Sequence, residues 1–119
     1  MSSVIKFLLI GIFIALINST VLATPPGIPV ELSYEVRETG EGFTHFDLRA
    51  RNIGLETTHE VTVAEAEGTY PAIYFGDLAP GTSASQSIRL TYQGEPPRLD
   101  WIVNYVDTNG RRIAVSYPQ

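Results

Sequence analysis

The stretch Val30-Glu31-Leu32-Ser33-Tyr34-Glu35-Val36-Arg37 alternates without a break between apolar and polar side chains. Successive side chains of an extended strand point to opposite faces, so one face of this stretch is apolar and the other is polar. Such a pattern is typical of an antiparallel strand with one face on a core and the other in water. Thr39-Gly40-Glu41-Gly42 supplies the turn that follows it.

Six further runs of similar character follow, each bounded by turn residues. The second run ends at Asn52-Ile53-Gly54, where Asn or Gly can adopt a positive φ. Pro71, near the start of the fourth run, favours the edge of a sheet. Asp107-Thr108-Asn109-Gly110 predicts a hairpin, because Asn-Gly is a strong hairpin signal. The predicted strands are Val30–Arg37, Phe46–Arg51, Glu60–Ala64, Tyr70–Phe75, Ser85–Tyr92, Leu99–Tyr105 and Arg111–Tyr117.

These runs predict an all-β fold, a seven-stranded antiparallel Ig-like β-sandwich. A small barrel is the alternative. The window Glu56–Glu67 is ambiguous in its periodicity, but its β-branched residues favour strand. We expect the alternation to bury four large side chains, with Trp101 between the two sheets. These side chains are Leu32, Leu48, Leu90 and Trp101.

Residues 1–23 have the organisation of a secretory signal peptide. Lys6 precedes the apolar run Phe7–Ile17, and Val21 and Ala23 occupy the −3 and −1 positions for cleavage after Ala23. An uncleaved membrane anchor is the alternative, but the apolar run has only about half of the roughly 20 residues needed to span a bilayer. We therefore expect an exported protein, either periplasmic or extracellular.

The expected organisation is a signal peptide over 1–23 and one domain over 24–119. Thr24-Pro25-Pro26-Gly27-Ile28-Pro29 opens this domain. We expect this segment to be stiff and extended, because prolines prevent helix and suit a chain that approaches a sheet edge.

Charge and composition exclude several classes of function. The formal net charge is −5, and Lys6 is the only lysine. An acidic domain with scattered arginines repels a phosphate backbone, so we expect no nucleic-acid partner. We expect membrane contact only if the leader stays uncleaved. The chain has no cysteine, which excludes disulfides, thiolate metal sites and cysteine nucleophiles.

Two motifs resemble segments of bacterial extracellular Ig-like modules. Asn52-Ile53-Gly54 followed by Val61-Thr62-Val63 resembles their N-x-G … V-x-V segment, and Leu78-Ala79-Pro80-Gly81-Thr82-Ser83 resembles their L-A-P-G-x-S turn. These modules include the CARDB-type and adhesion-associated repeats. The resemblance covers about residues 43–92. It implies a secreted β-sandwich that serves as a spacer or contact module.

Residues suited to catalysis or metal binding are few. His45 and His59 are the only histidines, whereas a metal site usually needs three or four close ligands. No Gly-x-Ser-x-Gly motif is present. Glu65 and Glu67 could form a carboxylate pair for glycoside hydrolysis, but their segment is more typical of a solvated turn. We expect no catalytic residue, no metal, no cofactor and no enzymatic activity.

Ligand binding is the alternative to a pure contact role. A calcium site would use Asp107 and Asp77, although a hairpin turn explains Asp107 fully. A carbohydrate platform needs exposed aromatic side chains, and the alternation directs most of them inward. Tyr70 and Tyr74 remain as candidate contact residues.

The sequence thus predicts a non-enzymatic Ig-like module that acts by protein contact in adhesion, assembly or a structural role. Its partner would be another envelope or extracellular protein, reached through a strand edge, a loop end or an exposed aromatic residue. We expect unpaired edges along Val30–Arg37 and Arg111–Tyr117. A carbohydrate- or calcium-binding accessory domain is the alternative. The oligomeric state stays open.

Overall fold

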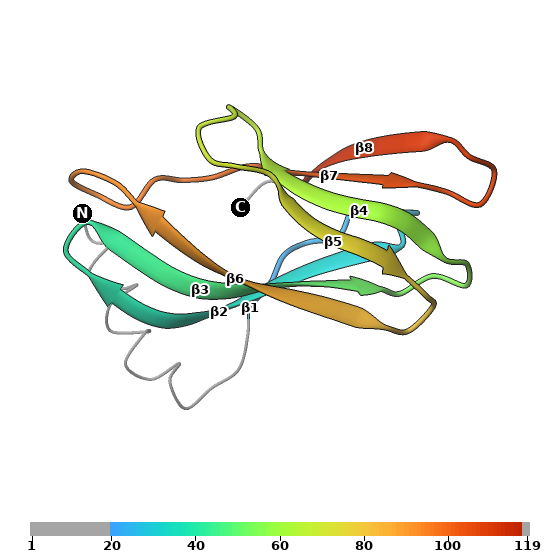
Figure 1. Ribbon diagram of the computed structural model, residues 1–119, viewed down its shortest axis with the longest axis horizontal. Helices are drawn as coiled ribbons and strands as arrows, with labels where there is room; N and C mark the ends of the chain where they lie inside the picture. Colours follow the sequence, from blue (N-terminus) through green and yellow to red (C-terminus); the bar gives the residue numbers. More distant parts are fainter. Residues whose placement is uncertain (1–19, 118–119) are drawn as a thin grey trace.

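The structure is a computed structural model that describes residues 20–117. These residues form two antiparallel four-stranded sheets that pack face to face (Figure 1). The first sheet has the order β1-β2-β3-β6, with the bounds Thr20–Val21, Val30–Gly40, Phe43–Asn52 and Ser83–Thr91. The second has the order β5-β4-β7-β8, with the bounds Ile73–Leu78, Thr58–Glu65, Trp101–Val106 and Arg112–Tyr117. Among residues 20–117, no helix is long and apolar enough to cross a bilayer.

The predicted all-β sandwich is confirmed, and the barrel alternative is wrong because the strands form two separate sheets. β3 pairs with β6, and β4 pairs with β7, so the chain crosses between the sheets at the ends of the sandwich. Immunoglobulin-like sandwiches share this kind of connectivity. The fourth predicted run, Tyr70–Phe75, is shifted in the structure, where β5 spans Ile73–Leu78 and Pro71 lies before it. The expected edge position of this strand is confirmed.

The described residues form eight strands, one more than the sequence predicts. The additional strand is β1, which the sequence assigns to the leader. Thr20 pairs with Tyr34 of β2, and Val21 pairs with Ser33. Leu22, directly after β1, is buried in the core. The rest of the predicted signal peptide, residues 1–19, lies outside the described residues.

The proline-rich segment is not extended throughout. The Ile28 N–H donates to the Pro25 carbonyl, with an N···O distance of 3.2 Å, and Gly27 has a φ of 77°. Pro26 and Gly27 therefore occupy the two central positions of a tight turn, which suit the fixed φ of proline and the positive φ of glycine. The expectation of an extended segment is wrong for residues 25–28, because this turn brings β1 antiparallel to β2.

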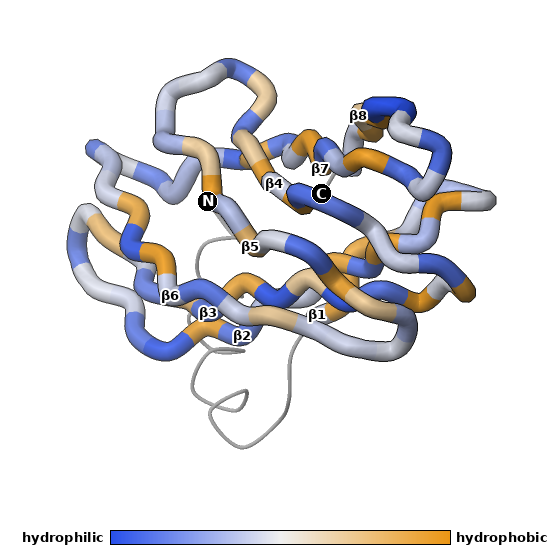
Figure 2. The backbone as a smooth tube through the Cα atoms, turned by 45° about the vertical axis from the view of Figure 1, so that its right-hand side comes forward, coloured by the Kyte–Doolittle hydropathy of each residue, from blue (hydrophilic) through white to orange (hydrophobic). Residues whose placement is uncertain are grey.

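The core lies between the sheets and confirms the predicted inward faces. Hydrophobic and hydrophilic residues alternate along the strands (Figure 2). Leu32, Leu48, Leu90 and Trp101 are all buried. The Trp101 ring meets the Phe46 ring edge to face across the core, with 6.5 Å between centroids. Such aromatic pairs stabilise beyond the area that they bury.

The predicted hairpin between β7 and β8 is confirmed. The Gly110 N–H donates to the Asp107 carbonyl at 3.0 Å, and the Asp107 N–H donates to the Arg111 carbonyl at 2.9 Å. Gly110 has a φ of 78°, which glycine adopts without steric cost. This is the three-residue hairpin loop in which a tight turn is followed by a left-handed glycine.

Candidate functional site

Asn52 joins the two motifs that resemble extracellular modules. Its side chain is fully buried, and its Nδ2 donates to the carbonyls of Glu56 at 2.7 Å and Leu78 at 2.8 Å. Its backbone N–H donates to the Thr82 carbonyl at 2.9 Å, and its carbonyl accepts from the Gly81 N–H at 2.8 Å. The Asn-x-Gly segment is therefore fastened to the Leu-Ala-Pro-Gly turn, and both motifs contribute to the fold.

The expected positive φ at Asn52 or Gly54 is wrong, since neither residue is among those with a positive φ. Asn52 Oδ1 instead accepts from the Gly54 N–H at 2.8 Å. A Cβ on Gly54 would lie 2.7 Å from the Cβ of Pro29. Close packing, rather than a left-handed backbone, explains the glycine.

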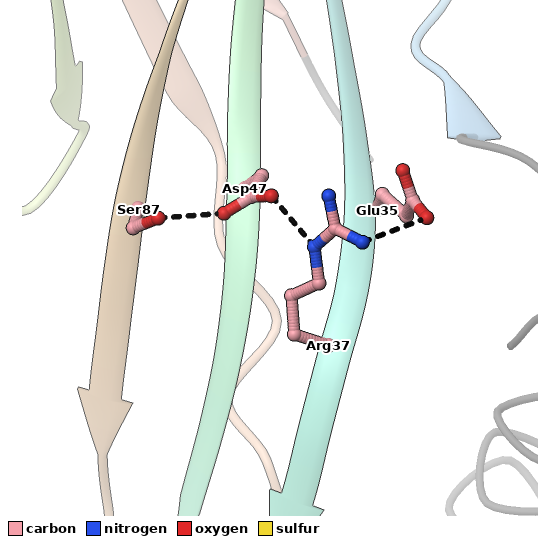
Figure 3. Close-up of polar contacts among 4 residues, drawn as sticks. All are labelled: Glu35, Arg37, Asp47 and Ser87. Atoms are coloured by element: carbon pink, nitrogen blue, oxygen red, sulfur yellow. Dashed lines mark hydrogen bonds and ion pairs between the residues drawn. The ribbon is translucent and has the colours of Figure 1, made fainter.

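A polar network crosses the outer face of the first sheet (Figure 3). Ser87 Oγ donates to Asp47 Oδ1 at 2.7 Å, and Arg37 Nε donates to Asp47 Oδ2 at 2.6 Å. Arg37 also bonds Glu35 at 3.3 Å. Arg37 falls in the β2 bulge, where the pairing with β3 shifts. A bulge re-aims a side chain, and here the guanidinium reaches the neighbouring strand.

The network makes Asp47 a weaker base than a free aspartate. The hydrogen bond from Ser87, followed by that from Arg37, holds the pKa of Asp47 below its usual range. A carboxylate with a lowered pKa accepts a proton less readily, so it activates a serine hydroxyl poorly. The network's evident role is to link β2, β3 and β6.

The two histidines considered as metal ligands lie on different sheets, with His45 on β3 and His59 on β4. His59 Nδ1 is 3.3 Å from Asp77 Oδ2. Asp77 Oδ1 accepts from the Glu60 N–H at 2.9 Å. This bond is the main cause of the lowered pKa of Asp77, and the hydrogen bond with His59 is the second. Glu60 has a φ of 51° at a bulge in β4. Asp77 therefore holds a strained backbone position.

The residues considered for calcium or acid catalysis are used within turns. Asp107 Oδ1 accepts from the N–H groups of Asn109 and Arg111, each at 2.9 Å. Glu65 is buried rather than solvated, and this expectation is wrong because its carboxylate turns back to accept from the Glu67 and Gly68 N–H groups. Within residues 20–117, no three His, Asp or Glu side chains are grouped as a metal site would require.

The two candidate contact residues have different surroundings. Tyr74 on β5 is 61% exposed. Tyr70 is half-buried against the core, and its hydroxyl donates to the Thr91 carbonyl at 3.2 Å. The structure describes no contact between the two rings, so they do not form a shared aromatic platform in the described part of the chain.

One apolar surface is absent from the sequence-based predictions. Leu55, in the loop between β3 and β4, is 95% exposed, and Ile53 is 48% exposed. Leu55 lies at a hollow of about 350 Å³, together with Pro29, Tyr105 and Ile113. Two aliphatic residues around Gly54 in a turn are a visible signal in the sequence, because turns rarely need such side chains for folding.

The outer edge of β8 is the second part of this candidate site. β8 pairs with β7 over six consecutive residues without a bulge, and no described strand lies on its other side. The Asp107 N–H donates to the Arg111 carbonyl, so Arg111 faces β7. Residues of an antiparallel strand alternate between facing the partner strand and facing away, so the N–H groups of Arg112, Ala114 and Ser116 face away from β7. The expected open edge at the last strand is confirmed, whereas β1 covers part of the β2 edge.

Comparison with known proteins does not assign the chain to a family. No family model and no curated protein matches the chain. The GAE domain of GGA2p from Saccharomyces cerevisiae is similar in structure, with 10% identity, a TM-score of 0.47, and coverage of 86% of this chain and 97% of that one. Northeast Structural Genomics Consortium target SoR45 has 16% identity, a TM-score of 0.37, and coverage of 74% and 80%. The β-sandwich assignment therefore stands on the sheet topology, and the resemblance to CARDB-type modules stays a prediction.

Proposed function

We propose that the protein is an exported, non-enzymatic Ig-like module that binds an extended segment of another envelope or extracellular protein along the edge of β8. The observation that supports this is the open edge of β8, beside a hollow that Leu55 and Ile113 line together with polar residues such as Glu56 and Asp107. Strand addition of this kind gives affinity through backbone hydrogen bonds and specificity through side-chain pockets.

The β8 edge lacks most devices that protect sheet edges. Proteins commonly guard such an edge with proline, a bulge, lysine or an inward-pointing charge. β8 has a regular register with β7, and its sequence Arg112-Ile113-Ala114-Val115-Ser116-Tyr117 has one charge, at its first residue. The backbone groups of Ala114 and Ser116 are therefore accessible to an added strand.

The apolar part of the hollow, formed by Pro29, Leu55, Tyr105 and Ile113, offers a place for an apolar side chain of the partner. Ile113 belongs both to β8 and to the lining of the hollow, so the edge and the hollow are continuous. Leu55 stands at the hollow almost completely exposed. Burying one leucine side chain contributes about 1.5–3 kcal/mol, which is enough to distinguish an apolar partner residue from a polar one.

A proline at position 114 tests the edge. Ala114→Pro removes the outward N–H while the bonds between β8 and β7 stay in place, and edge strands tolerate proline at such positions. Ala114→Thr is the matched control, because it keeps the N–H and favours strand. The partner is captured from the cell envelope, identified by mass spectrometry, and mapped by hydrogen exchange on residues 112–116.

We expect the wild type and Ala114→Thr to capture the same partner, with slower exchange in β8, and Ala114→Pro to lose it at unchanged melting temperature. Equal capture by Ala114→Pro, or no protection of β8 in the complex, would refute strand addition at this edge.

No specific observation favours the calcium or carbohydrate alternative. The Asp107 and Asp77 carboxylates bond different turn and bulge N–H groups. Tyr74 is the one largely exposed aromatic side chain among the described residues.

A further inference from the structure

We infer that cleavage after Ala23 opens a second strand-acceptor site, along the outer edge of β2, for an extended partner segment with an aliphatic side chain at the place of Leu22. This inference goes beyond the proposed function, because it concerns the other sheet and does not depend on β8. It depends on the processing that the sequence predicts.

Residues 20–22 show what the β2 edge accepts. Thr20 and Val21 pair antiparallel with Tyr34 and Ser33. The Leu22 N–H then donates to the Leu32 carbonyl at 2.9 Å. The backbone of β2 between positions 32 and 34 therefore has a strand partner on its outer side, and that partner is the end of the predicted leader.

Leu22 fixes this strand to the sandwich. Its side chain is only 7% exposed and belongs to the core cluster. Val21 points to the opposite side and is 55% exposed. The edge thus accommodates a buried aliphatic side chain at one position and an exposed one at the next, which is the alternation of an added strand.

Cleavage after Ala23 would place all of these residues on the leader side of the broken bond. The Leu32 carbonyl would lose its partner, and the core would lose a leucine side chain. Buried backbone groups without partners and empty apolar cavities both destabilise a fold. The processed domain would therefore present an edge and an adjoining cavity that match one kind of ligand.

The ligand that fits is an extended polypeptide running antiparallel to β2. A backbone with free N–H and C=O groups completes the ladder, and a leucine or similar side chain fills the cavity. β1 covers only two residues of β2, which runs from Val30 to Gly40, so a longer segment could continue along the same edge.

A peptide added in trans tests the site. The exported protein is purified from its cell envelope, and intact mass establishes its first residue. A synthetic peptide with the sequence of residues 17–23 is titrated into it by calorimetry, beside the same peptide carrying Leu22→Asp. Hydrogen exchange is measured at residues 32–34 with and without the peptide. The same titration is repeated with the Ala114→Pro protein, in which the β8 edge is blocked.

We expect the exported protein to begin at Thr24. The wild-type peptide should bind and slow hydrogen exchange at residues 32–34. The Leu22→Asp peptide should bind at least roughly ten-fold more weakly, because it would place a charge in an apolar cavity. Unchanged binding by Ala114→Pro would separate this site from β8. Any of four results would overturn the inference. The first residue could lie at or before Thr20, or the processed protein could fail to bind the peptide. Both peptides could bind equally, or the protein could be a dimer that already protects residues 32–34.

Discussion

Asn52 and Asp47 lie on the same strand, β3, and each connects several parts of the fold, but their surroundings are opposite. The Asn52 side chain is fully buried and makes three hydrogen bonds to backbone groups. Asp47 lies on the outer sheet face and bonds Ser87 and Arg37. Water competes much more for the exposed bonds of Asp47 than for those of Asn52, of which the bond to the Leu78 carbonyl is buried. The number of hydrogen bonds is therefore a poor measure of stabilisation, and burial decides it.

Replacement of the buried amide should have the largest effect. Asn52→Ala removes the amide partner of the buried Leu78 carbonyl and also the partners of the half-buried Glu56 carbonyl and Gly54 N–H, and an unsatisfied buried group costs about 1–3 kcal/mol. We expect a loss of about 3 kcal/mol in the free energy of unfolding, measured by urea denaturation. Asn109→Ala, in the exposed hairpin loop, is the control, with a change within about 0.5 kcal/mol. Equal effects of the two substitutions would contradict the comparison.

Tyr117→Phe should rank second. The buried Tyr117 hydroxyl donates to the Val30 carbonyl and so joins the two sheets. Its removal leaves one buried carbonyl without that partner, and we expect a loss of about 1–3 kcal/mol. Tyr74→Phe is the matched control, because its ring is largely exposed. A change below about 0.5 kcal/mol for Tyr117→Phe would show that this bond does not hold the sheets together.

The same tyrosine predicts a loss of stability in alkali. Burial, followed by the nearby Tyr105, raises the pKa of Tyr117 above its usual value. Because the folded protein holds this proton more tightly, the stabilisation is complete below the unfolded pKa of about 10 and is lost as the pH rises above it. Denaturation between pH 8 and pH 11 should show a steeper decline for the wild type than for Tyr117→Phe. Parallel curves would exclude Tyr117 as the cause.

Asp47→Asn should have a small effect that depends on salt. The network is partly exposed, and exposed ion pairs contribute less than about 1 kcal/mol. Since the pKa of Asp47 is lowered in the fold, its contribution is present above the unfolded value of about 3.9 and is lost as the pH falls through the folded value. Wild-type and Asp47→Asn stabilities should converge in acid and in high salt. A loss as large as that of Asn52→Ala would contradict the comparison.

Glu60→Gly should change stability least. Glycine relieves the positive φ at position 60 but gains freedom in the unfolded chain, and the two effects nearly cancel. We expect the free energy of unfolding, measured by urea denaturation, to lie within about 1 kcal/mol of the wild-type value. Glu60→Val should be clearly worse, because a β-branched residue tolerates this backbone poorly. A stable Glu60→Val protein would show that the bulge can relax to ordinary strand.

The sequence predicted the strands well because their alternation is a local property. The inward faces of β2, β3, β6 and β7 follow directly from side-chain period, and the hairpin at Gly110 follows from turn chemistry. Tyr70 was less well predicted, because its exposure depends on which other strand its ring meets. The exposed surface at Leu55 was not predicted for the converse reason, since an exposed leucine in a turn follows no strand pattern.

The sequence by itself determined the sandwich class, the buried aliphatic residues and the acidic surface, since each follows from residue type and spacing along the chain. Only the tertiary structure decided that Leu22 completes the core, that Glu65 caps a turn, and that Asn52 fastens two distant loops. These three depend on neighbours far away in the chain, and no local periodicity specifies which buried polar group will meet which backbone partner.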